Sequence, residues 1–229
     1  MINLARDLRG MIRNQDAAVW DQAAAFQREI RGMTLGIWGY GGIGRETARL
    51  ARALGLQVHV LVRNRVSPRD DTYTVPGTGD ADGVLPHRVW SAGQEIEFLR
   101  GLDFLIIAMP LTPATEGLIG ERELKALPGT AWVLNPARGP IIREQALLRA
   151  LDEGWIAGAA LDTHYTYPLP PEHPLWRYPN VILTPHISGS VRSQHFAKRI
   201  WEIFAINLER FGAGEPLLNL LTTEQLNGA

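Results

Sequence analysis

The stretch TLGIWGYGGIG, residues 34–44, constrains the fold most, because a short apolar run passes directly into closely spaced glycines. Gly39, Gly41 and Gly44 form the pattern G-x-G-x-x-G. In such a pattern the first glycine permits a tight turn, the second lets the backbone approach a pyrophosphate, and the third lets a helix pack closely on its strand. The stretch therefore predicts a dinucleotide-binding turn at a helix N-terminus, with an ordinary strand-to-helix turn as the alternative.

The neighbouring residues favour an α/β fold. RETARLARALG (45–55) has the spacing of an amphipathic helix that ends at Gly55, and QVHVLV (57–62) is a second strand. Strands that alternate with helices predict a doubly wound parallel sheet of the Rossmann type. Further strands are expected at 103–110, 130–137, 156–162 and 180–186, and further helices at 93–102, 121–128, 143–154 and 190–211.

Apolar residues at helical spacing predict two helices before the first strand, 3–14 and 17–27. Residues 64–86 are rich in Pro, Gly, Asp and Thr, which indicates a long surface loop. The expected organisation is an N-terminal helical arm (1–30), a dinucleotide-binding domain (31–190) and a C-terminal helix and tail (191–229).

The composition narrows the class of protein. The 229 residues carry a formal net charge of -1 with no long basic run, so we expect no nucleic-acid or membrane partner. The chain has no cysteine, which excludes disulfides, thiolate catalysis and zinc–thiolate sites, and we expect no metal site. Because neither a signal peptide nor an apolar run of about 20 residues is visible, we expect a cytoplasmic protein.

The end of the second strand indicates which dinucleotide is bound. An acid that binds the ribose is expected about 20 residues after the glycines. Arg63, Asn64 and Arg65 occupy that region instead. Arginines bind a 2′-phosphate, whereas an acid repels it, so NADP is favoured over NAD. The alternative is that both arginines are solvated loop charges.

Four stretches together resemble the D-isomer-specific 2-hydroxyacid dehydrogenases in order and spacing, from about residue 3 to 220. They are TLGIWGYGGIGRETARLARALGLQV, MPLTPATEGLI, LNPARGPIIREQALLRALDEGWIAGAALD and NVILTPHISG. The resemblance implies hydride exchange between a nicotinamide and a 2-keto or 2-hydroxy acid, of the glyoxylate or hydroxypyruvate reductase type, usually in a homodimer.

Two residues fit this chemistry. Reduction of a keto acid needs a cation for the substrate carboxylate and a proton donor at the carbonyl oxygen. Arg138 follows a strand, at the edge where doubly wound sheets bind ligands, and its planar guanidinium suits a carboxylate. His186 follows another strand and can donate and accept a proton near neutral pH.

The resemblance also implies a cofactor lining. Asp162 would hold the nicotinamide carboxamide, with a buried capping aspartate as the alternative. His164 and His173 match no catalytic position and are expected to be loop residues. The other expected cofactor residues are Gly42, Ile43, Pro110, Thr115, Pro136, Ala137, Arg138, His186, Ser188 and Gly189, with Gly39, Gly41, Gly44, Arg63 and Arg65 from the residues above.

The chain departs from the family pattern at Tyr167, where a glutamate that pairs with the histidine is expected. A carboxylate stabilises an imidazolium, whereas a phenol with a pKa near 10 is neutral at pH 7. Tyr167 can therefore orient His186 but cannot stabilise its charge in the same way. Glu172 is a possible spatial substitute.

A second departure concerns length, because only 38 residues precede Gly39, where the family has a whole substrate lobe. In complete members the C-terminal helix would pack on that lobe. The N-terminal arm, with Trp20 and Phe26, is expected to cover a partner subunit in a homodimer. Two alternatives to the dehydrogenase remain: a non-catalytic NAD(P)-binding or dimerisation module, and a formate- or phosphite-type dehydrogenase.

Overall fold

The computed structural model describes residues 1–69, 72–189, 193–221 and 223. Within these residues seven parallel strands form one sheet in the order β3-β2-β1-β4-β5-β6-β7. The predicted doubly wound parallel sheet is confirmed, and its strand order reverses between β1 and β4. The strands are β1 Thr34–Trp38, β2 Gln57–Val62, β3 Arg88–Ser91, β4 Phe104–Ile107, β5 Trp132–Asn135, β6 Gly158–Leu161 and β7 Val181–Leu183.

Helices cover both faces of the sheet, so alternate side chains of a central strand enter two different cores. In β4, Phe104 and Ile106 belong to one buried cluster, whereas Leu105 and Ile107 belong to the other. The first cluster includes residues of α1 and α3, and the second includes residues of α4, α5 and α6. The helices are α1 Ile2–Ala5, α2 Leu8–Asp16, α3 Gly42–Ala53, α4 Glu95–Leu99, α5 Glu121–Ala126, α6 Glu144–Asp152 and α7 Gln194–Gly212.

The N-terminal helices differ from the prediction. The expected helix 3–14 is broken at Asp7, which has a left-handed φ of 42° and whose carboxylate accepts a hydrogen bond from the Gly10 amide at 3.1 Å. The expected helix 17–27 is wrong apart from a 3₁₀ turn, Ala24–Gln27. Ala18 has a φ of 54°, which ends the helical path, and a helix without a packed face gains little stability.

One strand and the first residues of two helices also differ from the prediction. β3 was missed because its four residues form a largely exposed edge strand without apolar alternation. Helix α3 begins at Gly42, inside the glycine pattern, rather than at residue 45. Helix α7 begins at Gln194, where the Ser193 hydroxyl accepts from the Phe196 amide at 3.2 Å. Residues 190–192 of the expected helix 190–211 lie outside the described residues.

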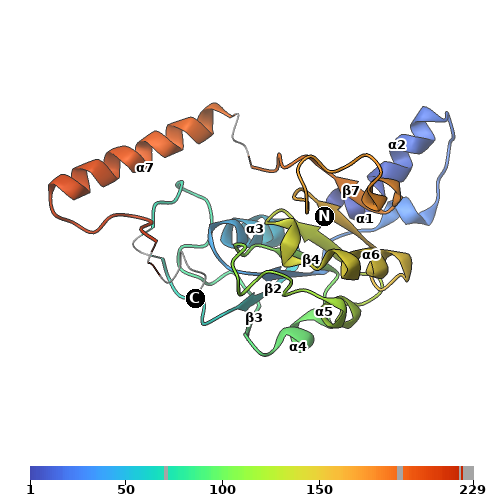
Figure 1. Ribbon diagram of the computed structural model, residues 1–229, viewed down its shortest axis with the longest axis horizontal. Helices are drawn as coiled ribbons and strands as arrows, with labels where there is room; N and C mark the ends of the chain where they lie inside the picture. Colours follow the sequence, from blue (N-terminus) through green and yellow to red (C-terminus); the bar gives the residue numbers. More distant parts are fainter. Residues whose placement is uncertain (70–71, 190–192, 222, 224–229) are drawn as a thin grey trace.

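Helices α2 and α7 project from the body of the molecule. Figure 1 shows α2 at one end of the molecule and α7 extending away from the other. The apolar residues of α7 that share one side in the sequence pattern are exposed rather than packed on the described body; they include Phe196, Ile200, Phe204 and Leu208. None of the described helices is both long and apolar enough to span a membrane.

Candidate functional site

The glycine turn lies where β1, β2 and β4 end. Gly39 has a φ of +100°, and a Cβ there would lie 2.7 Å from the carbonyl oxygen of Ala108. Its amide donates to the carbonyl oxygen of Leu61 at 2.9 Å. Conformation and space therefore both require glycine, and the turn is fixed to the end of β2.

The rest of the turn forms an open cradle at the start of α3. A Cβ on Gly44 would lie 2.4 Å from the Gly39 carbonyl oxygen, so this glycine lets the helix approach the strand. A Cβ on Gly41 or Gly42 would meet no atom within 4 Å. Gly41 is the N-cap of α3 and offers no side chain, so the first-turn amides point to open space. This arrangement fits the pyrophosphate of a dinucleotide.

Arg63 and Arg65 follow β2 at the same edge of the sheet, and both are exposed. Neither guanidinium forms a hydrogen bond or ion pair with the described part of the chain. The two arginines follow β2 close to the glycine turn, since β1 and β2 pair in parallel up to Trp38 and Leu61. The expected acid is absent from this position, as the sequence indicated.

The segment after β4 is held by one hydroxyl group. The Thr115 hydroxyl donates to the Pro110 carbonyl oxygen at 2.7 Å and accepts from the Thr112 amide at 2.8 Å. Through these hydrogen bonds, Thr115 has a structural role in the loop that follows β4, beside the glycine turn. A direct contact of Thr115 or Pro110 with a cofactor stays a prediction.

The turn that presents Arg138 is organised by a buried amide. Asn135, the last residue of β5, accepts from the Ala137 amide at 3.1 Å and donates to the Arg138 carbonyl oxygen at 2.8 Å. The Arg138 guanidinium donates to the Ala137 carbonyl oxygen at 2.7 Å. Arg138 is exposed and forms no ion pair with the carboxylates that the structure describes, so its charge is available to an anion.

Asp162, just after β6, fastens the loop that carries His186. One carboxylate oxygen accepts from the Thr184 hydroxyl at 2.6 Å and the Ile187 amide at 2.9 Å. The other oxygen accepts from the Ser188 hydroxyl at 2.6 Å and the Ser188 amide at 3.0 Å. Burial raises the pKa of Asp162, but these hydrogen bonds outweigh burial and lower the pKa below its usual value. These contacts fit the capping aspartate given as the alternative, and a contact of Asp162 with the nicotinamide carboxamide stays a prediction.

His186 sits at a bend with a φ of 56°, and its amide donates to the Asp162 carbonyl oxygen at 2.8 Å. Its side chain is exposed, and the rings of His186 and Tyr167 have centroids 5.6 Å apart at 43°. The Tyr167 hydroxyl accepts from the His164 amide at 3.1 Å, so the phenol meets the imidazole through its ring. Glu172 is exposed and is not bonded to His186 among the described residues.

The two loop histidines have structural contacts that the sequence did not reveal. His164 is only 5% exposed, and its Nε2 bonds to the Thr184 carbonyl oxygen at 2.9 Å, which makes Nε2 the donor. Within the described chain, its Nδ1 has no partner. His173 bonds to Glu144 at 2.6 Å through Nε2 and accepts from the Leu175 amide at 3.2 Å through Nδ1.

The expected site residues thus lie along one edge of the sheet, where the strands end. The glycine turn follows β1, Arg63 and Arg65 follow β2, Arg138 follows β5, and His186 follows β7. This is the edge at which doubly wound sheets bind ligands, next to the reversal of strand order between β1 and β4. Fold and glycine cradle together define an α/β dinucleotide-binding protein.

Comparison with known proteins gives the family. The family model described as "D-isomer specific 2-hydroxyacid dehydrogenase, NAD binding domain" matches residues 1–188. The chain belongs to this family. A glyoxylate reductase of Thermofilum pendens is 36% identical over 198 residues, which cover 86% of this chain and 54% of the relative. The chain therefore spans about half the length of the curated relatives it matches.

Solved structures agree with this family. An NADPH-dependent glyoxylate/hydroxypyruvate reductase of Sinorhizobium meliloti, in complex with NADP and sulfate, is 27% identical with a TM-score of 0.79 and covers 100% of this chain and 66% of its own. A D-isomer specific 2-hydroxyacid dehydrogenase of Xanthobacter autotrophicus, in complex with NADPH and MES, is 29% identical with a TM-score of 0.79 and covers 98% of this chain and 84% of its own. These similarities support binding of NAD(P).

Proposed function

We propose that this chain binds NADP(H) and transfers hydride between the cofactor and a 2-keto or 2-hydroxy acid. The observation that supports this most is the pair of exposed side chains, Arg138 and His186, at the sheet edge that also carries the glycine cradle. A bound reduced nicotinamide supplies the hydride. Arg138 binds the substrate carboxylate, and His186 gives a proton to the carbonyl oxygen as the hydride arrives.

Small keto acids are the proposed substrates. The relatives from Thermofilum pendens and Sinorhizobium meliloti are named as reductases of glyoxylate, or of glyoxylate and hydroxypyruvate. A single planar guanidinium at Arg138 matches the one carboxylate that such substrates carry. Glyoxylate and hydroxypyruvate are therefore the first compounds to assay.

The preference for NADP over NAD rests on Arg63 and Arg65. Both are exposed beside the glycine turn, and no described carboxylate neutralises them. A doubly charged 2′-phosphate is attracted to such a pair, whereas the ribose 2′-hydroxyl of NAD gains little from it.

The deciding experiment is oxidation of NADPH by the chain in the presence of glyoxylate, hydroxypyruvate or phenylpyruvate. We expect turnover with at least one of them. The matched control is His186→Gln, which removes the proton donor and should abolish turnover while NADPH still binds. Tight NADPH binding by the unaltered chain without turnover of any keto acid would refute the proposed enzymatic function.

That negative result would favour the second candidate, a non-catalytic NAD(P)-binding or dimerisation module. Tyr167 is the observation in its favour, because the ring beside His186 lacks the carboxylate that would stabilise an imidazolium. A module of this kind would bind NADPH with the same glycine cradle, so binding alone does not separate the two candidates.

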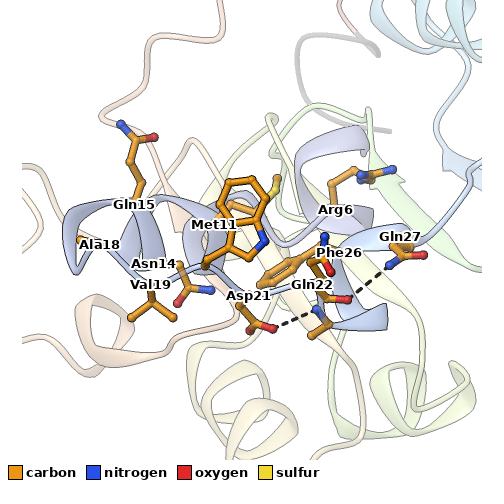
Figure 2. Close-up of a pocket in the computed structure, with 12 residues that line it drawn as sticks. Arg6, Met11, Asn14, Gln15, Ala18, Val19, Asp21, Gln22, Phe26 and Gln27 are labelled. Atoms are coloured by element: carbon orange, nitrogen blue, oxygen red, sulfur yellow. Dashed lines mark hydrogen bonds between the residues drawn. The ribbon is translucent and has the colours of Figure 1, made fainter.

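We further propose a homodimer in the cytoplasm, in which residues 1–30 act as an arm over the partner and 191–229 pack on a substrate lobe. Trp20 is 89% exposed. Trp20 and Phe26 both line a concave surface between α2 and the following segment, which encloses a volume of about 860 Å³. Figure 2 shows the side chains around this surface, with Phe26 and Met11 turned toward its centre. It lies on the arm, away from the glycine cradle, which suits a partner rather than a cofactor.

A further inference from the structure

One buried arginine bonds to two distant positions of the segment between β2 and β3, residues 63–87. Arg45, in the first turn of α3, donates to the Ser67 carbonyl oxygen at 2.6 Å and also to the Asp80 carbonyl oxygen. Ser67 lies on the outgoing arm of the segment and Asp80 on the returning arm. Arg45 is only 6% exposed, so both arms are held to the helix that begins at the glycine cradle.

A second contact joins the same segment to the glycine pattern itself. Tyr40 stands between Gly39 and Gly41, and its hydroxyl donates to Asp80 Oδ2 at 2.6 Å. The Asp80 carboxylate also accepts from the amides of Val84 and Leu85, each at 3.1 Å. The Arg45 guanidinium lies 5.0 Å from the centre of the Tyr40 ring. Burial and the bond to Asp80 raise the pKa of Tyr40, so its hydroxyl stays a donor.

Two backbone anchors bracket the short stretch that contains the exposed arginines. Its first end is anchored where the Gly39 amide donates to the Leu61 carbonyl oxygen at 2.9 Å. Its second end is anchored at Ser67 by Arg45. Arg63 and Arg65 lie between the two anchors and are themselves unbonded to the described residues. Fixing the backbone that carries these side chains before a ligand arrives reduces part of the ordering entropy that binding would otherwise cost.

We propose that Arg45, Tyr40 and Asp80 are positioning residues that determine cofactor choice, because they hold Arg63 and Arg65 where the adenosine 2′-phosphate of NADP binds. This inference rests on the proposed function. Arg45 does not touch the phosphate, since its guanidinium is buried and committed to the two loop carbonyls. The effect is confined to the phosphate, which NAD lacks, so loss of the network should weaken NADPH binding and spare NADH.

The test is titration of the whole chain with NADPH and with NADH, followed by tryptophan fluorescence. Tyr40→Phe removes only the hydroxyl that bonds Asp80 and keeps the ring beneath Arg45. We expect its Kd for NADPH to rise about tenfold, or about 1.4 kcal/mol, while its Kd for NADH changes less than twofold. Asp80→Asn should behave alike, and the melting temperature of each variant reports whether it folds.

A matched control lies in the same segment. The Tyr73 hydroxyl donates to Glu202 of α7 at 2.6 Å, so Tyr73→Phe deletes an equivalent hydroxyl bond that involves none of Arg45, Tyr40 and Asp80. We expect Tyr73→Phe to leave the ratio of the two dissociation constants unchanged. Equal weakening of NADPH and NADH by Tyr40→Phe would overturn the proposal, because it would mark a scaffold of the glycine turn rather than a determinant of cofactor choice.

A double-mutant cycle tests the link to the arginines. In the background Arg63→Gln with Arg65→Gln, the change Tyr40→Phe should have no further effect on NADPH binding. Additive effects would overturn the proposal. If the unaltered chain binds neither nucleotide, the proposed function fails and this inference with it. If it binds NADPH more tightly than NADH and Tyr40→Phe leaves that preference intact, this inference alone fails.

Discussion

The hydroxyl of Tyr167 accepts a hydrogen bond from the backbone N–H of His164 at 3.1 Å, while the Tyr167 ring lies against the His186 ring with centroids 5.6 Å apart. Tyr167 thus occupies the place beside the histidine without offering it an acceptor. His164 in turn bonds to the carbonyl oxygen of Thr184, two residues before His186. The Tyr167 hydroxyl therefore helps to hold the loop that carries His164, and Tyr167 contacts the His186 imidazole only through its ring.

Replacement of Tyr167 by glutamate is expected to extend the proposed reductase activity toward alkaline pH. A carboxylate beside an imidazole favours the protonated ring, which is the form that donates a proton to the substrate. We expect the alkaline limb of the rate of NADPH oxidation to move up by about one pH unit, as typical for a neighbouring opposite charge. Tyr167→Phe serves as the control and should leave the limb in place. An unmoved limb in Tyr167→Glu would contradict the assigned contact with His186.

Apart from the edge strand β3, the sheet and the order of its elements could be predicted from the sequence, because each depends on local patterns. The apolar run of β4 and the glycines after β1 carry their structure in adjacent residues. The arm could not be predicted in the same way. Leu4 and Leu8 have helical spacing, yet the helix breaks between them at Asp7, whose carboxylate caps α2 instead.

The candidate site could be predicted only in part from the sequence, for a related reason. Arg138 and His186 follow strands and stand in recognisable motifs, so their common sheet edge follows from the parallel topology. The contact between Tyr40 and Asp80 joins residues 40 positions apart through a segment with no regular pattern. Nothing in the sequence around Asp80 indicates a buried carboxylate. The only hint is Arg45, a charged residue that directly follows Gly44, where the helix must pack closely on its strand.

Two glycines of the same turn should respond differently to alanine. A Cβ at position 44 would lie 2.4 Å from the Gly39 carbonyl oxygen, so Gly44→Ala should destabilise the fold by about 1–3 kcal/mol, the usual cost of overpacking. Gly41→Ala meets no atom within 4 Å and should leave the melting temperature unchanged. We nevertheless expect Gly41→Ala to weaken NADPH binding at least about tenfold, since its Cβ enters the cradle. Unaltered NADPH affinity in Gly41→Ala would place the pyrophosphate elsewhere.

Asp162→Asn is expected to destabilise the protein at neutral pH. An asparagine keeps one acceptor oxygen but turns an NH₂ group toward the Ser188 amide, leaving donors face to face at a cost of about 1–3 kcal/mol. The folded-state pKa of Asp162 is lowered, so its charge contributes stability that is present above the unfolded pKa of about 3.9 and lost as the pH falls through the folded pKa.

Urea unfolding of wild type and Asp162→Asn at pH 7 and near pH 3 checks both statements. The difference in the free energy of unfolding should be large at pH 7 and smaller near pH 3, below the unfolded pKa of about 3.9, because protonation of Asp162 in the unfolded chain then favours unfolding of the wild type. A difference as large near pH 3 as at pH 7 would show that the charge of Asp162 has no part in holding the Ser188 loop.

Trp20→Glu is expected to convert the proposed homodimer into a monomer. Trp20 is 89% exposed beside the concave surface of the arm, and a large exposed indole is the kind of side chain that anchors protein interfaces. A glutamate there would bury a charge in the proposed contact, so the mass measured by light scattering should fall to half. The matched control is Trp201→Glu, because Trp201 of α7 is 68% exposed at the other end of the molecule. Dissociation by Trp201→Glu instead would place the interface on α7, and a monomeric mass for the unaltered chain would refute the dimer.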